Sequence, residues 1–233
     1  MMARMSALET LIERPPYRIA HVPGTSADLV IAFASIGHDP ARMPSPEFLR
    51  SATAQNRPAL FVMDQSRSRA TAPGFAEGLT GAVALLRTRQ PIAKILGIGA
   101  SMGAYAALCA ARVLPMTAIL AIGPQHRPGL KTEARWRDWT ANLPEILTAP
   151  LPPGPYACLM HALQDDGTQA LAFPQAKGVE HMLFALRTHS SLAPHLKARG
   201  VIEGLIEAAL SNDRRRLLRI LQSAGGIRRG TVR

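Results

Sequence analysis

Short apolar runs alternate along this chain with longer helix-favouring segments, and this alternation constrains the fold more than any other feature. The runs are bounded by Gly, Pro or Asp and are apolar almost throughout. Such continuous apolar character is typical of parallel strands buried on both faces of a sheet. We therefore predict strands at 29–34, 59–63, 94–100, 117–122 and 156–163, with a weaker candidate at 18–22.

The segments between these runs favour helices. Apolar residues recur at helical spacing from Phe75 to Leu86, and Pro91 ends that segment before the next strand. Residues 102–113 are rich in alanine, which favours a helix. The alternation predicts a three-layer α/β domain, with a mostly parallel sheet and helices on both faces.

The composition is that of a folded protein in a reducing compartment. The 233 residues are 47% hydrophobic, which excludes a disordered chain. Two cysteines, Cys109 and Cys158, cannot make a disulfide framework. Residues 1–17 lack the apolar core of a secretion signal, and no run approaches the roughly 20 apolar residues of a membrane span. We expect a cytoplasmic protein without a membrane span.

The net charge of +11 is concentrated at one end of the chain. Residues 213–233 contain seven arginines and one acidic residue, so they contribute six of the eleven charges. We predict a short basic helix there, with an apolar stripe from Leu217 to Leu221, then a stop at Gly225-Gly226 and a frayed tail. Nucleic-acid binding is disfavoured, because residues 197–233 contain no Phe, Tyr or Trp to stack on bases. The arginines either form a solvated face or bind an anionic partner such as RNA, lipid headgroups or acyl-carrier protein.

A Gly-x-Ser-x-Gly motif carries the clearest chemical signal. It is formed by Gly99-Ala100-Ser101-Met102-Gly103, between an apolar strand candidate and the alanine-rich helix candidate. A sharp strand-to-helix turn presents a serine hydroxyl to a base, and glycines two residues before and after it relieve crowding. The helix N-terminus that follows directs free N–H groups toward a developing oxyanion.

On this motif the sequence resembles the α/β-hydrolase superfamily, specifically at 99–103 and diffusely over 17–196. Other glycine-rich loops fit less well. A dinucleotide fingerprint starting at Gly97 would need a glycine where Met102 stands, and a P-loop Gly-Lys-Ser/Thr is absent from the sequence. The resemblance implies an α/β-hydrolase sheet, Ser101 as nucleophile, and the chain order serine, acid, histidine.

The resemblance places the histidine in a loop just past a late strand. Five histidines follow Ser101, at positions 126, 161, 181, 189 and 195. We predict His181 as the base, because 177–181 reads as a short polar loop before a helix-compatible run at 182–187. The alternatives His126 and His161 are interpreted as surface or core residues.

The acid is expected at the end of the 156–163 strand. Asp165 is our candidate to orient His181, with Asp166 in reserve and Asp64, after an earlier strand, as a third possibility. The 16 positions from Asp165 to His181 are few for a helix plus a strand. Asp166-Gly167 is also a hairpin signal, for which an ordinary turn aspartate suffices.

The remaining site predictions concern backbone and surface groups. The oxyanion hole is predicted to use the N–H of Met102 and a second N–H from Ser35 or Ile36. The arginines of the loop 64–69 either bind an anionic substrate group or belong to a solvated polar loop. No Cys/His cluster has zinc spacing, and we predict no cofactor.

We expect an α/β-hydrolase domain over 1–212, and a basic helix and tail over 213–233. Residues 124–148 contain Trp136 and Trp139, which would share one helical face, either as a small lid or cap over the site or as a helix covering the sheet. A proline-rich connector at 149–155 leads into the next strand.

The predicted activity is that of a carboxylesterase-like serine hydrolase, which cleaves an ester or thioester of a small acyl substrate through an acyl-serine. Acyl transfer or thioesterase action on a carrier-bound acyl group is the first alternative, and a non-catalytic hydrolase-fold binding protein is the second. An assembly of several copies of the chain stays open.

Overall fold

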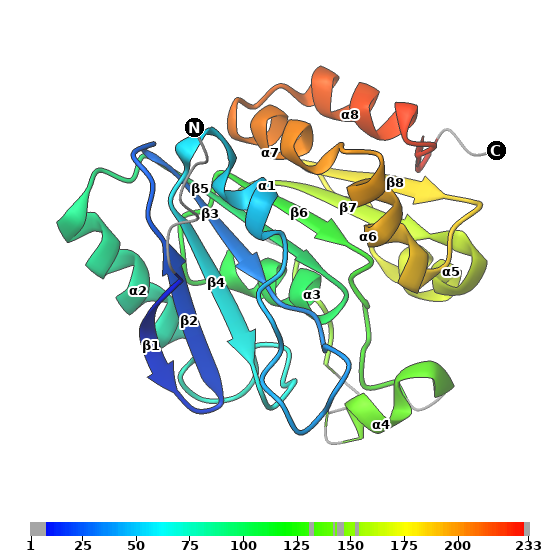
Figure 1. The fold of residues 1–233 in the computed structure, drawn as a ribbon. Helices are drawn as coiled ribbons and strands as arrows, with labels where there is room; N and C mark the ends of the chain where they lie inside the picture. Colours follow the sequence, from blue (N-terminus) through cyan, green and yellow to red (C-terminus); the bar gives the residue numbers. More distant parts are fainter. Residues whose placement is uncertain (1–7, 131–132, 142, 144–146, 152–153, 231–233) are drawn as a thin grey trace.

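The computed structural model describes residues 8–130, 133–141, 143, 147–151 and 154–230. Within these ranges the chain forms one sheet of nine strands, in the order β1-β2-β4-β3-β5-β6-β7-β8-β9 (Figure 1). The strands are β1 (Glu9–Arg14), β2 (Tyr17–Val22), β3 (Asp28–Phe33), β4 (Ala59–Asp64), β5 (Lys94–Ala100), β6 (Ala118–Ile122), β7 (Tyr156–Ala162), β8 (Val179–Phe184) and β9 (Ile227–Arg228).

The six central strands, from β4 to β8 across the sheet, are parallel to one another. β2 is antiparallel to both β1 and β4, and β9 is antiparallel to β8. All six strand predictions are confirmed to within one residue at each end. The sheet is therefore mostly parallel, as predicted.

Helices cover both faces of the sheet (Figure 1). The core on one face contains residues of α2 and α3, and the core on the other contains residues of α1, α6, α7 and α8. The helices are α1 (Leu49–Thr53), α2 (Phe75–Arg89), α3 (Met102–Ala110), α4 (Arg137–Thr140), α5 (Leu163–Ala172), α6 (His189–Ala198), α7 (Ile202–Leu210) and α8 (Arg214–Ser223), with short 3-10 turns at Ala54–Asn56 and Ala134–Trp136. This is the predicted three-layer arrangement.

Two segments near the site differ from the prediction. The segment 177–187 was expected to be a loop and then a helix, but Val179–Phe184 forms β8 and α6 begins only at His189. Asp165 and Asp166 lie in the first turn of α5, so Asp166-Gly167 is not a hairpin turn. Both differences have the same cause. In each segment, polar side chains that indicated a surface loop or turn are buried against residues that lie far away in the sequence.

The basic C-terminal segment is part of the packed structure. The predicted helix is α8. Its Leu217 and Leu221 are fully buried in the same hydrophobic core as residues of α7. The frayed tail expected after Gly226 is wrong for 227–228, which pair with β8 as β9. Arg233 and the rest of 231–233 lie outside the described residues, as do Pro152 and Pro153 of the predicted connector.

Three of the tail's arginines are paired within the chain. Arg214 and Arg228 both form ion pairs with the buried Glu180, and Arg216 pairs with Glu207 at 2.8 Å. In the part of the chain that the structure describes, no helix combines the length and apolarity needed to span a membrane.

Candidate active site

Ser101 stands at the sharp turn between β5 and α3. Its backbone has φ 52° and ψ −118°, a conformation that residues with a side chain seldom adopt. The N–H of Ser101 donates to the carbonyl of Ile122 at 2.8 Å, which ties the turn to the end of β6. The serine is thereby fixed at the carboxyl edge of the parallel strands.

The two motif glycines are required by close backbone contacts. A Cβ on Gly99 would lie 2.2 Å from the carbonyl carbon of Gly103, and a Cβ on Gly103 would lie 2.2 Å from the carbonyl oxygen of Phe33. Real Cβ atoms do not approach other heavy atoms so closely, so only glycine fits at either position. The two glycines thus allow close backbone packing on either side of Ser101.

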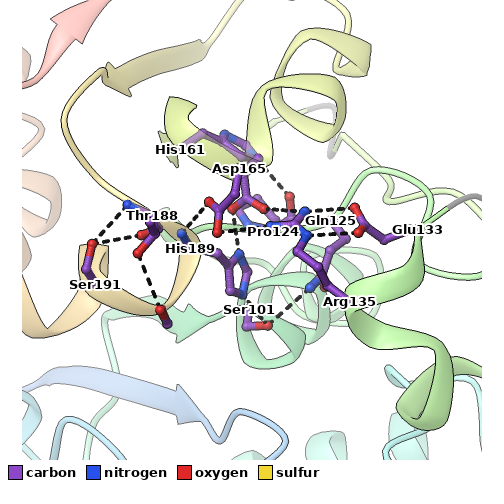
Figure 2. A network of polar contacts seen from close by, with 12 residues as sticks. Ser101, Pro124, Gln125, Glu133, Arg135, His161, Asp165, Thr188, His189 and Ser191 are labelled. Atoms are coloured by element: carbon purple, nitrogen blue, oxygen red, sulfur yellow. Dashed lines mark hydrogen bonds and ion pairs between the residues drawn. The ribbon is translucent and has the colours of Figure 1, made fainter.

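His189 is the histidine that the fold brings to Ser101 (Figure 2). Its Nε2 lies 2.9 Å from Ser101 Oγ, and its Nδ1 lies 2.5 Å from Oδ2 of Asp166. Because a carboxylate only accepts hydrogen bonds, Nδ1–H donates to Asp166, which leaves Nε2 of the neutral ring to accept the serine proton. The Asp166 side chain is 2% exposed and that of His189 is 7% exposed, so the pair is shielded from water.

Asp165 holds the same histidine by its backbone. Oδ1 of Asp165 accepts the N–H of His189 at 2.6 Å. His189 is the first residue of α6, and a capping box between Thr188 and Ser191 fixes the start of that helix. The two adjacent aspartates therefore hold both the ring and the main chain of His189.

Arg135 reaches the aspartates from the segment between β6 and β7 (Figure 2). Its guanidinium lies 3.2 Å from both Asp165 Oδ2 and Asp166 Oδ1, and it also pairs with Glu133 at 2.7 Å. Glu133 raises the pKa of Arg135 by hydrogen bonding, and Arg135 lowers the pKa of Glu133 in the same way. The ring of the adjacent Trp136 lies 4.7 Å from the His189 ring, centroid to centroid.

The predicted lid residues are thus partly in contact with the site. Trp136 lies at the end of a 3-10 turn and Trp139 lies in α4, where its ring faces Arg67 at 5.7 Å. Residues 131–132, 142 and 144–146 of the predicted insertion lie outside the described residues. A lid function for 124–148 stays a prediction.

Gln125 contacts Ser101 from the loop after β6. Its Nε2 donates to Ser101 Oγ at 3.3 Å, and the residue is 1% exposed. This buried amide helps to fix the serine hydroxyl. The sequence prediction did not include Gln125.

The prediction of His181 as the base is wrong, because the fold does not bring this residue to Ser101. It lies inside β8 and belongs to a buried chain of hydrogen bonds: Arg229 faces its Nδ1 at 3.3 Å, and its Nε2 lies 2.8 Å from His161 Nδ1. His161 Nε2 in turn donates to the carbonyl of Pro124 at 2.8 Å. Since that carbonyl only accepts, His161 Nε2 carries a proton. When both rings are neutral, His161 Nδ1 is then an acceptor, and His181 Nε2 donates a proton to it. His181 therefore has no lone pair free for Ser101.

Burial also keeps these two rings neutral. It lowers the pKa of His181 to about 4, with Arg229 adding to the effect, and it lowers the pKa of the fully buried His161 to about 3. His126, another alternative from the sequence, packs edge-on against Phe173 at 4.9 Å.

The other predicted site residues have mixed outcomes. Asp64, the third acid candidate, is the last residue of β4, and its carboxylate accepts hydrogen bonds from Ser66 and Ser68.

Met102 is the first residue of α3, so its N–H has no acceptor within the helix and lies next to Ser101. The N–H of Ser35 donates to Glu47 at 3.0 Å, so Ile36 is the predicted second donor whose N–H is not used in this way.

Solved structures with similar folds support this description of the architecture. An α/β serine hydrolase without lid from Xanthomonas campestris has a TM-score of 0.53 and 14% identity, over 90% of this chain and 97% of that one. A bacterial heroin esterase has a TM-score of 0.55 and 18% identity, over 92% and 85% of the two chains. The capsule O-acetyltransferase of Neisseria meningitidis serogroup A has a TM-score of 0.55 and 11% identity, over 82% and 92%.

The chain has the α/β-hydrolase fold. At the sequence level no family model and no curated protein matches it. In this fold the residues that meet at Ser101 come from the carboxyl ends of β5, β6 and β7 and from the segment that follows β8. Among the described residues, no group of three or more His, Cys, Asp or Glu could hold a metal ion.

A sequence signal for His189 exists within the α/β-hydrolase fold. Thr188 and Ser191 are a Thr-x-x-Ser pair ahead of an apolar helix pattern, which is a helix-start signal. A helix beginning at 189 requires the preceding strand to end near Phe184, and His189 then follows the loop after that strand. The separation also fits, because 23 positions from Asp166 to His189 leave room for a helix and a strand.

Proposed function

We propose that the protein is a serine hydrolase that cleaves a carboxylic ester or thioester through an acyl-serine. One observation carries the proposal: Ser101 Oγ lies 2.9 Å from His189 Nε2, and Asp166 holds Nδ1 of the same ring. This is the order of nucleophile, base and orienting acid that acyl transfer requires. The strained backbone of Ser101 supports the proposal, because such strain is concentrated at functional residues.

In the proposed reaction, His189 Nε2 takes the proton of Ser101 as Oγ bonds to the substrate's carbonyl carbon. The carbonyl oxygen becomes an oxyanion beside the N–H of Met102, with Ile36 as the second donor. Collapse of this intermediate breaks the bond to the alcohol or thiol, which leaves with the proton from His189. Water then attacks the acyl-serine, gives a proton to His189, and releases the acid as that proton returns to Ser101.

Covalent labelling tests the proposal directly. A fluorophosphonate probe should modify the wild-type protein once, at Ser101 by peptide mapping, and should fail to modify Ser101→Ala. The same substitution should reduce hydrolysis of an activated ester at least about a thousandfold. A folded wild-type protein that takes up no probe and cleaves no ester would contradict the proposal and favour a non-catalytic binding protein.

Acyl transfer is the second candidate, because the acyl-serine can be attacked by an alcohol or a carrier thiol in place of water. One structural neighbour is an O-acetyltransferase by name. Product analysis in the presence of a small alcohol distinguishes the two reactions, since transfer forms a new ester and hydrolysis forms only the free acid.

A further inference from the structure

Arg69 is a buried arginine with two guanidinium nitrogens that lack a hydrogen-bond partner. The residue is 1% exposed, and its Nε and Nη1 have no hydrogen-bond partner. No carboxylate of the described residues forms an ion pair with it. An unpaired guanidinium is costly to bury, so such a group in a folded protein calls for an explanation.

The neighbouring Arg67 shows what a structural arginine looks like in the same loop. Its guanidinium donates to five backbone carbonyls, among them those of Asp39 at 2.8 Å and Arg42 at 2.7 Å. Both arginines are buried, so the interpretation of 64–69 as a solvated polar loop is wrong for them, although Gln65 and Ser66 are exposed. Arg67 holds the loop together, whereas Nε and Nη1 of Arg69 are buried without an acceptor.

A cavity adjoins Arg69 next to the proposed oxyanion hole. It is lined by Arg69, by Ala34 after β3, by Met102 at the start of α3 and by Asp64, and its volume is about 10 Å³. That is room for one atom of the size of a water oxygen. One oxygen of a carboxylate fits, and the rest of that group would have to lie outside the cavity.

The electrostatic surroundings favour an anion at this place. The N-terminus of α3, where Met102 stands, carries partial positive charge. Burial lowers the pKa of Arg69 only to about 10, so the guanidinium stays charged at neutral pH. Asp64 also lines the cavity and its negative charge acts on Arg69, but its oxygens accept hydrogen bonds from Ser66 and Ser68 and none from Arg69.

We propose that Arg69 binds a carboxylate on the acyl part of the substrate, so that the preferred substrates are esters of short dicarboxylic acids. The inference rests on the proposed function, because it places the ester carbonyl at Ser101 and Met102. In this proposal the acyl chain extends from the carbonyl past Met102, which lines the cavity together with Arg69. There the carboxylate supplies the acceptor that the guanidinium lacks.

A matched pair of substrates tests the inference. Mono-(4-nitrophenyl) glutarate and 4-nitrophenyl pentanoate have acyl chains of five carbons and differ in the terminal carboxylate. We expect the wild-type protein to cleave the glutarate ester with a kcat/KM at least about tenfold higher. Arg69→Met should abolish this preference while the pentanoate ester is still cleaved, and Arg87→Met, at an exposed position of α2, should retain it. Equal cleavage of the two esters by the wild-type protein would overturn the inference, whether or not the variants fold.

Binding without turnover separates this inference from the proposed function. Calorimetry should detect glutarate binding to Ser101→Ala and lose it in Ser101→Ala/Arg69→Met. If neither ester is cleaved but this binding is seen, the proposed function fails and the Arg69 site stands. If chloride raises the unfolding temperature of the wild type but not of Arg69→Met, while glutarate does not bind, Arg69 holds a free inorganic anion and the substrate inference is wrong.

Discussion

Asp166 Oδ2 lies 2.5 Å from Nδ1 of His189, while the adjacent Asp165 accepts the backbone N–H of the same histidine at 2.6 Å. Two consecutive carboxylates thus have different tasks. Asp165 fixes the start of α6, and in the proposed mechanism Asp166 orients the imidazole and stabilises its charged form.

Conservative substitution separates the two aspartates. Asp166→Asn removes the carboxylate that holds the correct tautomer of His189, and we expect kcat to fall by about 10²–10⁴. Asp165→Asn keeps an oxygen that accepts the His189 N–H, so kcat should change about threefold or less. Steady-state kinetics on an activated ester, with circular dichroism to verify folding, measures both. A larger loss for Asp165→Asn would reverse the assignment.

Arg135 should influence both the rate and its pH dependence. Its guanidinium lies 3.2 Å from Asp166 Oδ1, on a side chain that is 30% exposed. Arg135→Gln should lower kcat/KM about fivefold, since a partly exposed ion pair contributes about 1 kcal/mol. Without this positive charge, Asp166 stabilises the protonated imidazole of His189 more strongly, and the acid limb of the pH–rate profile should move to higher pH. A purely structural role for Arg135 would leave that limb in place.

The buried pair His161–His181 predicts a loss of stability in mild acid. Burial lowers the folded-state pKa of His181 to about 4, below the ordinary value of 6.5. The unfolded chain therefore binds more protons as the pH falls from about 6.5 toward 4, and folding loses about 2 kcal/mol at pH 5 from this group alone. Urea unfolding at pH 7 and pH 5 measures the loss, and His181→Gln should show a smaller difference between the two.

Removing α8 should destabilise the whole protein. Leu217 and Leu221 are fully buried, and each buried leucine contributes about 1.5–3 kcal/mol. A chain ending at Ser211 should therefore lose about 3–6 kcal/mol of unfolding free energy. The double substitution Arg215→Glu/Arg219→Glu changes only exposed residues and should leave stability within about 1 kcal/mol. It is the appropriate variant for testing whether the basic surface binds an anionic partner.

The parts of the site that depend on local sequence could be predicted, and the parts that depend on distant partners could not. The turn at Ser101 is specified by its own glycines and by the strand and helix beside it. The polar residues Glu180 and His181 made a strand resemble a polar loop. Their partners could not be seen locally, since Arg228 and Arg229 each come 48 positions later. Because this strand was not predicted, the expected loop after the last strand was placed too early, and His181 was chosen in place of His189.

The choice between Asp165 and Asp166 was beyond sequence reasoning for a geometric reason. Both lie in the first turn of α5, and the direction of each side chain depends on where that helix begins. Arg69 was one of two arginines in a polar loop, and only the packing shows that Arg67 is fully bonded whereas Nε and Nη1 of Arg69 have no partner.

The most direct test of the account compares two histidine substitutions on one activated ester. His189→Ala removes the group 2.9 Å from Ser101 Oγ, and we expect kcat/KM to fall by at least about a thousandfold. His181→Ala removes a ring in a structural hydrogen-bond chain, so it should lower the unfolding temperature and leave kcat/KM of the folded protein within about tenfold. Full activity in folded His189→Ala, or its loss only in His181→Ala, would contradict the account.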